Sequence, residues 1–122
     1  MPFVLIVYIH YDMSTDIFNR LLECSGFEWD EGNAPKIQAR HGVTPGECEQ
    51  VFFCEPLFIA SDAKHSGSEE RWAAWGRTAE GRALAIIFTL RGQRIRPISA
   101  RDMNHKERER YAQAAAKDQA DS

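Results

Sequence analysis

The sequence lacks most of the features that mark special classes of protein. Its three cysteines (Cys24, Cys48 and Cys54) are an odd number without a CxxC pair, so neither a disulfide framework nor a zinc site is expected, and a reducing cytoplasm is the simpler setting. The only apolar run, Phe3–Ile9, is too short to span a membrane, and no basic residue precedes it as in a signal peptide. No internal repeat and no glycine-rich phosphate loop are present. These absences predict a protein without membrane contact and without a cofactor.

The composition is that of an ordinary globular protein. The 122 residues are 43% hydrophobic and 27% charged, which excludes collagen-like, wholly disordered and multi-pass membrane proteins. A chain of this length fits one domain with its own hydrophobic core. The apolar run at the start is interpreted either as a buried strand or as the result of a start placed too early, since Met13 would make a natural alternative start.

The two halves of the chain differ in charge. Residues 1–61 hold nine acidic side chains and three basic ones, whereas residues 71–101 hold seven arginines and only one acid, Glu80. Such asymmetry indicates a polyanionic partner for the basic part. Arginine matches phosphate better than lysine does, because its planar fork can donate two parallel hydrogen bonds. The alternative is a basic sheet face that is only solvated.

Local patterns predict an α+β layer protein with two N-terminal helices, a four-stranded antiparallel sheet and a C-terminal helix. A short helical turn over 18–22 precedes a helix that starts near Ala34, with Asp30 as its cap, and ends at Gly42. A capping box at Thr44–Glu47 starts the next helix, which we expect to end at Pro56. Strands over 57–60, 71–78, 82–90 and 93–100 follow, and Asn104–Glu107 caps the last helix.

An ordered series of short motifs between Phe27 and Tyr111 carries a resemblance to a known family. It runs through Phe27-Glu-Trp-Asp, Arg40-His-Gly-Val, Val51-Phe-Phe, Pro56-Leu, Asp62…His65-Ser66, Glu69-Glu-Arg71, Gly76-Arg77-Thr78, Phe88-Thr89, Ile95-Arg96-Pro-Ile-Ser-Ala-Arg101 and Glu107-Arg-Glu-Arg-Tyr111. Each motif is weak alone, but the series resembles the BrnT family, the toxin component of bacterial BrnT–BrnA type II toxin–antitoxin systems. Pro35 and Pro97 depart from the usual pattern.

The resemblance implies a RelE-like fold and a ribonuclease that inhibits translation. It also implies neutralisation by a small ribbon-helix-helix antitoxin similar to BrnA, and binding of operator DNA through the toxin–antitoxin complex. On this basis residues 27–111 form the toxin domain, residues 1–26 an N-terminal extension and residues 112–122 a polar tail. Two other readings stay open: a non-catalytic member that binds the antitoxin and co-represses its operon, and a stand-alone RNA-binding module.

Cleavage of RNA without a metal needs a base for the 2′-hydroxyl, positive groups for the phosphorane and an acid for the leaving oxygen. We expect Arg77 and Arg96 to stabilise the phosphorane, and His65 and Glu70 to be candidates for proton transfer. His65 could equally be an exposed loop histidine, and Glu70 could simply pair with an arginine. A metal site is not expected, since no second ligand stands at a suitable spacing from His65.

Further residues are predicted to contact RNA. They are Lys36, Arg40, Arg82, Arg94, Arg101 and Trp75, the last by stacking on an unpaired base. Arg94 and Arg96 alternate around Ile95, so both are expected on one face of a strand. Trp72 and Trp75 should fall on opposite faces of their strand, so that only one faces the core. For Lys36 and Arg40 a solvated helix face is the alternative.

Overall fold

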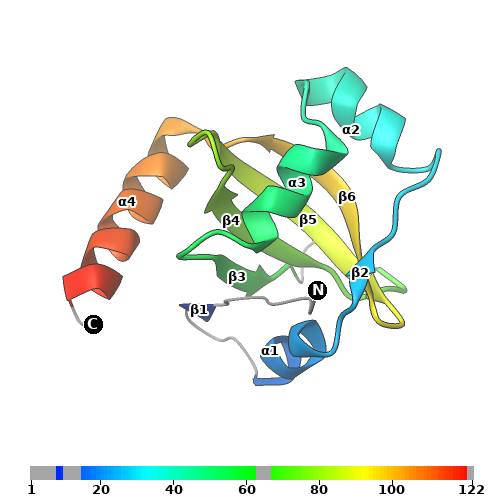
Figure 1. The fold of residues 1–122 in the computed structure, drawn as a ribbon, viewed down its shortest axis with the longest axis horizontal. Helices are drawn as coiled ribbons and strands as arrows, with labels where there is room; N and C mark the ends of the chain where they lie inside the picture. The colour runs from blue at the N-terminus through cyan, green and yellow to red at the C-terminus, as the bar shows by residue number, and fades with distance from the viewer. Residues whose placement is uncertain (1–7, 10–14, 63–66, 121–122) are drawn as a thin grey trace.

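The computed structural model describes residues 8–9, 15–62 and 67–120, and its elements confirm an α+β protein (Figure 1). In chain order these are β1 (Tyr8–Ile9), α1 (Thr15–Leu22), β2 (Gly26–Phe27), α2 (Ala34–His41), α3 (Pro45–Phe52), β3 (Phe58–Ser61), β4 (Trp72–Arg77), β5 (Ala83–Arg91), β6 (Arg94–Asp102) and α4 (His105–Ala120). The predicted order of two helices, four strands and one helix is therefore incomplete, because α1 is a full helix and two short strands precede β3.

The antiparallel meander β3-β4-β5-β6 is confirmed, but the sheet is larger than predicted. Its described strands are ordered β1-β3-β4-β5-β6-β2, and the two outer strands run parallel to their neighbours. Each outer strand is two residues long. Strands of two residues are too short to show an alternation of apolar and polar side chains, so they can be identified only from their backbone pairing. Of the apolar run Phe3–Ile9, only the last two residues are among those described, as β1.

The helix signals were partly correct. The capping box is present, with Glu47 N–H donating to the Thr44 hydroxyl and Thr44 N–H donating to the Glu47 carboxylate. That helix, α3, ends at Phe52, before Pro56. Helix α2 starts at Ala34 as predicted, and its cap Gly42, directly after the last residue His41, is in the left-handed conformation with φ 63°. Its cap is Asn33 and not Asp30, whose carboxylate binds an arginine instead.

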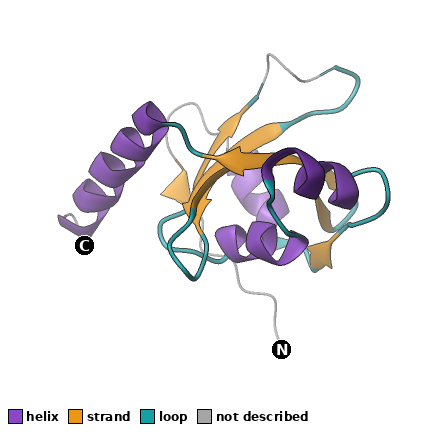
Figure 2. Cartoon of the chain, turned by 90° about the horizontal axis from the view of Figure 1, so that it is seen from above, coloured by secondary structure: helices purple, strands orange, loops and turns teal. Residues whose placement is uncertain are grey.

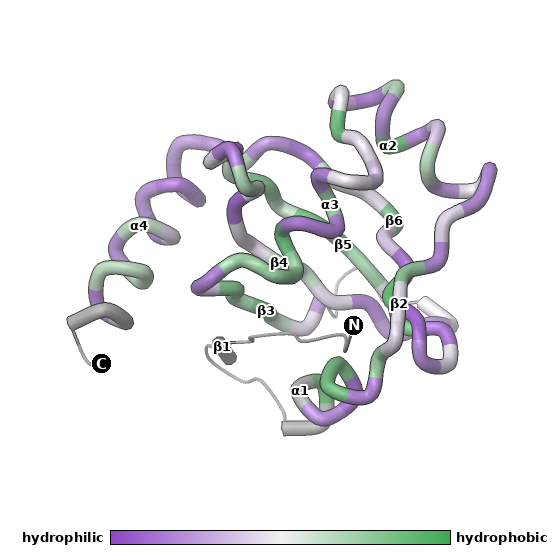
Figure 3. Tube along the Cα trace, viewed as in Figure 1, coloured by the Kyte–Doolittle hydropathy of each residue, from purple (hydrophilic) through white to green (hydrophobic). Residues whose placement is uncertain are grey.

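The two faces of the sheet bury different clusters. The main core, with Phe52, Ile86 and Phe88 fully buried, lies on the face covered by α1 and α3. On the opposite face, α4 covers only one end of the sheet and lies apart from the other helices (Figure 2). The hydrophobic strands β3, β4 and β5 separate these layers (Figure 3). Trp72 packs in the main core, whereas the half-buried Trp75 lies on the opposite face against the α4 cluster, so the prediction that only one of them faces the main core is confirmed.

Pro97 is accommodated by an irregularity in the last hairpin. The register between β5 and β6 shifts between Ile87 and Phe88, so that Phe88 pairs with Pro97 while Ile87 pairs with Ser99. One extra residue on β6 is the signature of a β-bulge, which tolerates a residue without an amide donor. The Pro97 carbonyl accepts a hydrogen bond from the Asn33 side chain, which anchors the start of α2 to the sheet.

Candidate functional site

Most of the basic charge between residues 71 and 101 is neutralised inside the molecule. At least four of the seven arginines form ion pairs with carboxylates of the described residues: Arg82, Arg91, Arg96 and Arg101. Several of their partners, Glu28, Asp30 and Glu47, come from the acidic first half of the chain. The opposite charges of the two halves are therefore largely explained by ion pairs within the protein. Only the basic side chains outside these pairs still indicate a polyanionic partner.

Arg96 is held by the segment that follows β2. Its guanidinium donates to Asp30 at 2.9 and 3.1 Å and to Glu28 at 2.9 Å, and its side chain is only 11% exposed. The hydrogen bond from Arg96 is the main reason that the pKa of Asp30 lies below its usual value. Because Glu28 and Asp30 flank Trp29, this arginine anchors the backbone on both sides of that indole.

Arg82 connects three elements through hydrogen bonds and ion pairs. It forms a bidentate pair with Asp102 of β6, at 2.7 and 3.1 Å, and contacts Glu47 of α3 at 3.2 Å. It also donates to the carbonyls of His41 and Gly42 at the end of α2. Its hydrogen bond lowers the pKa of Asp102. These contacts occupy the guanidinium that was predicted to bind RNA.

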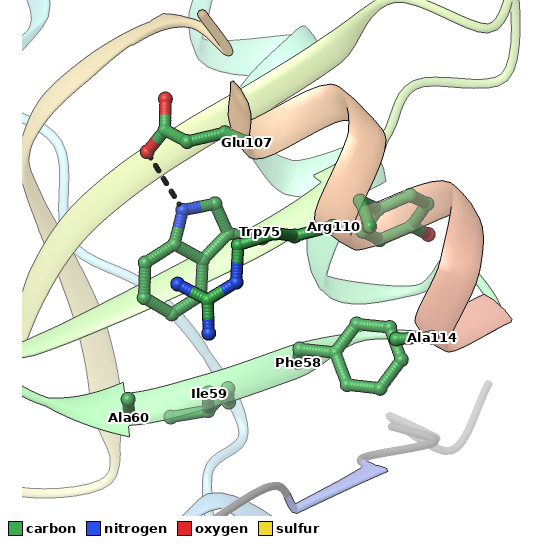
Figure 4. A pocket seen from close by; sticks show the side chains of 8 residues that line it. Phe58, Ile59, Ala60, Trp75, Glu107, Arg110 and Ala114 are labelled. Atoms are coloured by element: carbon green, nitrogen blue, oxygen red, sulfur yellow. Dashed lines mark hydrogen bonds between the residues drawn. The ribbon is translucent and has the colours of Figure 1, made fainter. Parts of the chain in front are cut away.

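Arg101 and Trp75 converge on Glu107 of α4. Arg101 donates to both carboxylate oxygens at 2.6 and 3.1 Å. The Trp75 indole N–H donates to Glu107 at 3.0 Å, as Figure 4 shows. Hydrogen bonding from Arg101 is the main cause of a Glu107 pKa of about 2. Beside this network is a cavity of about 230 Å³ whose lining includes Phe58, Trp75, Arg110, Tyr111 and Ala114. Trp75 thus packs and hydrogen-bonds inside the protein.

Arg77 differs from the four paired arginines because it has no carboxylate at ion-pair distance among the described residues. Its side chain is exposed, and its guanidinium lies over the Tyr111 ring at 5.0 Å from the centroid. Its backbone N–H donates to the Cys54 sulfur at 3.3 Å. Burial raises the pKa of Tyr111 to about 12 and also raises that of Cys54, so both groups stay protonated at neutral pH.

A hollow of about 550 Å³ adjoins Arg77. It lies between the outer face of α3 and the chain that leaves β4, and its lining includes Glu49, Gln50, Phe53, Cys54, Arg77 and Thr78. The Glu49 carboxylate accepts a hydrogen bond from the Trp29 indole at 2.8 Å, and the Gln50 side chain accepts one from Ala79 N–H at 2.9 Å. The hollow therefore combines a guanidinium that pairs with no carboxylate of the described chain and an oriented carboxylate.

The register of the sheet keeps Arg77 and Arg96 apart. Arg77 pairs with Ala83 on β5, whereas Arg96 pairs with Thr89 of the same strand. Six residues of extended strand correspond to roughly 20 Å. One phosphorane is far smaller than this separation, and Arg96 is additionally held by two carboxylates. The structure thus does not bring the two predicted catalytic arginines together.

The other predicted residues lie elsewhere. Glu70 is exposed and its carboxylate is 3.5 Å from the Arg20 guanidinium, which lies over Trp72 at the far end of β4. His65 lies outside the described residues. Three cations predicted to contact RNA are exposed, namely Lys36 and Arg40 on α2 and Arg94 at the start of β6.

Glu49 and Phe53 of the hollow were not predicted from the sequence. Glu49 lies on α3 and Phe53 directly follows its last residue. From the sequence, Glu49 could equally be a solvated acid and Phe53 a core aromatic. Phe53 is 43% exposed, and only Leu22 among the described large hydrophobic residues is also classed as exposed. The sequence could not predict that Phe53 is exposed, because a helix this short does not show which of its neighbouring side chains are buried.

Two further properties bear on the chemistry. Among the described residues no group of three or more histidine, cysteine, aspartate or glutamate side chains is arranged to hold a metal ion. Within the same part of the chain, no helix has the length and apolar character that crossing a membrane requires.

The comparison with protein families agrees with the sequence motifs. A family model described as the ribonuclease toxin BrnT of type II toxin–antitoxin systems matches residues 29–107. The matched span begins at Trp29 and contains Glu49, Arg77, Arg96 and Arg101. A search among curated proteins finds no match. Since the family model covers well over half of the chain, this protein belongs to the BrnT family of type II toxin–antitoxin toxins.

Proposed function

We propose that this protein is an RNA endonuclease that works without a metal ion and inhibits translation. The observation that carries the proposal is Arg77, an exposed arginine that pairs with no carboxylate of the described residues, beside a hollow that also presents the Glu49 carboxylate. Family membership supports a ribonuclease activity. The arrangement supplies a cation for a phosphate and an oxygen base for a hydroxyl proton in one place.

In this proposal Arg77 stabilises the negative charge that develops on the phosphorane. Electrostatic stabilisation of this kind usually contributes most to the rate enhancement. Glu49 takes the proton of the 2′-hydroxyl, whose oxygen attacks the adjacent phosphorus. The bond from phosphorus to the 5′ oxygen breaks, and this leaving oxygen takes a proton from water in the open hollow. The products are a 2′,3′-cyclic phosphate and a free 5′-hydroxyl.

Arg96 has a positioning role in the same proposal. Its contacts with Glu28 and Asp30 hold the backbone around Trp29, and the Trp29 indole in turn holds the Glu49 carboxylate. Arg96 therefore positions the Glu49 carboxylate indirectly, through the segment around Trp29, and does not touch RNA in this proposal. Lys36, Arg40 and Arg94 stay candidates for contacts with more distant phosphates, because their charges face solvent.

The proposal also includes the setting in which such a toxin acts. Membership of a type II family implies an antitoxin partner. We propose that this antitoxin is a small ribbon-helix-helix protein similar to BrnA, that the complex binds operator DNA through it, and that the toxin acts in the cytoplasm.

The proposal is tested by incubating purified protein with end-labelled RNA in the presence of EDTA. We expect cleavage that leaves cyclic phosphate ends, and a loss on the order of 100- to 1,000-fold for Arg77→Ala. Arg77→Lys should recover only part, since the charge returns without the fork. Glu49→Gln should also lose activity, while the matched control Arg110→Ala, at an exposed arginine of α4 that does not line the hollow, keeps it. Absence of cleavage by folded wild-type protein, with antitoxin binding intact, would favour the non-catalytic alternative.

A further inference from the structure

The hollow beside Arg77 carries an exposed aromatic side chain that the proposed chemistry does not use. Phe53 follows the last residue of α3 and is 43% exposed, although most large apolar side chains of the described chain are buried. An isolated exposed hydrophobic residue needs no explanation by itself. This one, however, lines the same hollow as Arg77.

The orientation of Phe53 is set by its neighbours. Its ring makes an edge contact with Phe27 at 6.2 Å between centroids, and Phe27 makes a second edge contact with the buried Phe52 at 5.6 Å. A ring supported at its edge by a packed aromatic chain is held in place while part of its surface stays in contact with solvent. Such a fixed platform can stack a planar ligand at little cost in side-chain entropy.

The backbone keeps this platform next to the cation. Cys54, the residue after Phe53, accepts the backbone N–H of Arg77 at 3.3 Å. Gln50, one helical turn before Cys54, accepts a hydrogen bond from Ala79 N–H at 2.9 Å through its side-chain oxygen, and its amide N–H groups have no acceptor among the described residues. An aromatic face, an arginine and a hydrogen-bond donor therefore border one hollow.

These groups match the parts of a nucleotide whose base is not paired. A base offers a π face for stacking and polar edges for hydrogen bonds, and its phosphate offers charge to arginine. The volume of about 550 Å³ lies within the range of pockets that hold ligands of this size. A duplex presents its bases stacked on one another, so it cannot offer a free face to Phe53.

We infer that Phe53 stacks on an unpaired base next to the phosphate held by Arg77, so that the hollow binds single-stranded RNA and rejects duplex. The inference rests on the proposed function for the identity of that phosphate. It makes Phe53 a specificity-determining residue and not a participant in proton transfer.

The test measures binding and not cleavage. Wild-type protein and variants are titrated with a fluorescent RNA of about 12 nucleotides of mixed sequence, fully 2′-O-methylated so that no nucleophile is present, and with the same strand in a duplex. We expect Phe53→Ala to weaken single-strand binding by about 5- to 100-fold, the range for loss of one stacked base. Phe53→Tyr should bind like the wild type, and the duplex should bind weakly to all.

Leu22→Ala is the matched control, because Leu22 is the other exposed large hydrophobic residue of the described chain, and it lies on α1 and does not line the hollow. Urea denaturation confirms that each variant is folded. Equal binding by Phe53→Ala and wild type, or equal binding of duplex and single strand, overturns the inference. Loss of antitoxin binding alone in Phe53→Ala also overturns it and makes Phe53 a protein contact. Cleavage of unmodified RNA is scored separately, so failure of the enzyme and failure of the stacking site give different results.

Discussion

Replacement of Arg96 by alanine separates a structural from a catalytic role for this residue. The substitution removes three charge-assisted hydrogen bonds to Asp30 and Glu28 and the packing of a side chain that is 11% exposed. The two acids lose their common partner, and the segment around Trp29 loses its attachment to β6. We therefore expect Arg96→Ala to lower the stability of the protein as well as its activity.

The size of the effect follows from the exposure of the partners. A hydrogen bond to a charged group contributes about 1.5–3 kcal/mol, and breaking a fully buried ion pair costs about 3–5 kcal/mol. The Asp30 side chain is 53% exposed and that of Glu28 is 26% exposed, so water replaces much of what the arginine provided. We expect a loss of about 2 kcal/mol in the free energy of unfolding, or about 8 °C in Tm for a chain of this length.

The assay is urea denaturation followed by tryptophan fluorescence, with Arg94→Ala as the control. Arg94 lies two residues away on the same strand and is exposed, so its removal should change the free energy of unfolding by less than about 0.5 kcal/mol. If Arg96→Ala is as stable as Arg94→Ala yet cleaves no RNA, Arg96 contacts the phosphate directly and the positioning role is refuted.

Two other perturbations have defined outcomes. The pKa of Glu107 is about 2, below its unfolded value, so the stability it contributes is complete above about pH 4.5 and is lost as the pH falls toward 2. Thermal melts should show a smaller decline in Tm over this range for Glu107→Gln than for the wild type. Parallel declines in Tm would count against the Arg101 contact. A Cβ on Gly76 would lie 2.5 Å from the Cys54 sulfur and 3.0 Å from Val51. Gly76→Ala should therefore lower the free energy of unfolding by about 1–3 kcal/mol through overpacking. An unchanged urea midpoint would show that α3 packs less closely on β4.

The sequence predicted the elements whose signals are local. The Thr44–Glu47 capping box, the left-handed Gly42 and the strands of the meander depend on neighbouring residues, and each was identified. The outer strands β1 and β2 depend on parallel pairing with distant strands and carry only two residues each. Such pairing leaves no periodic pattern, so the mixed character of the sheet was not predictable.

The candidate site was predictable only in part for the same reason. The arginine-rich strands were visible, but whether an arginine is available depends on acids that approach from elsewhere in the chain. Glu28 and Asp30 meet Arg96 across more than sixty residues. Glu49 and Phe53 enter the site only because α3 packs against the end of β4, a contact that no local pattern of residues encodes.

Expression in bacteria without an antitoxin tests the central claim most directly, because it asks whether the chain is a toxin and whether Arg77 makes it one. Growth and the integrity of cellular RNA are followed for wild type, Arg77→Ala and the control Arg110→Ala, at equal levels of soluble protein. We predict growth arrest with loss of RNA for the wild type and the control, and normal growth for Arg77→Ala. Normal growth with soluble wild-type protein, or undiminished toxicity of folded Arg77→Ala, would contradict the account.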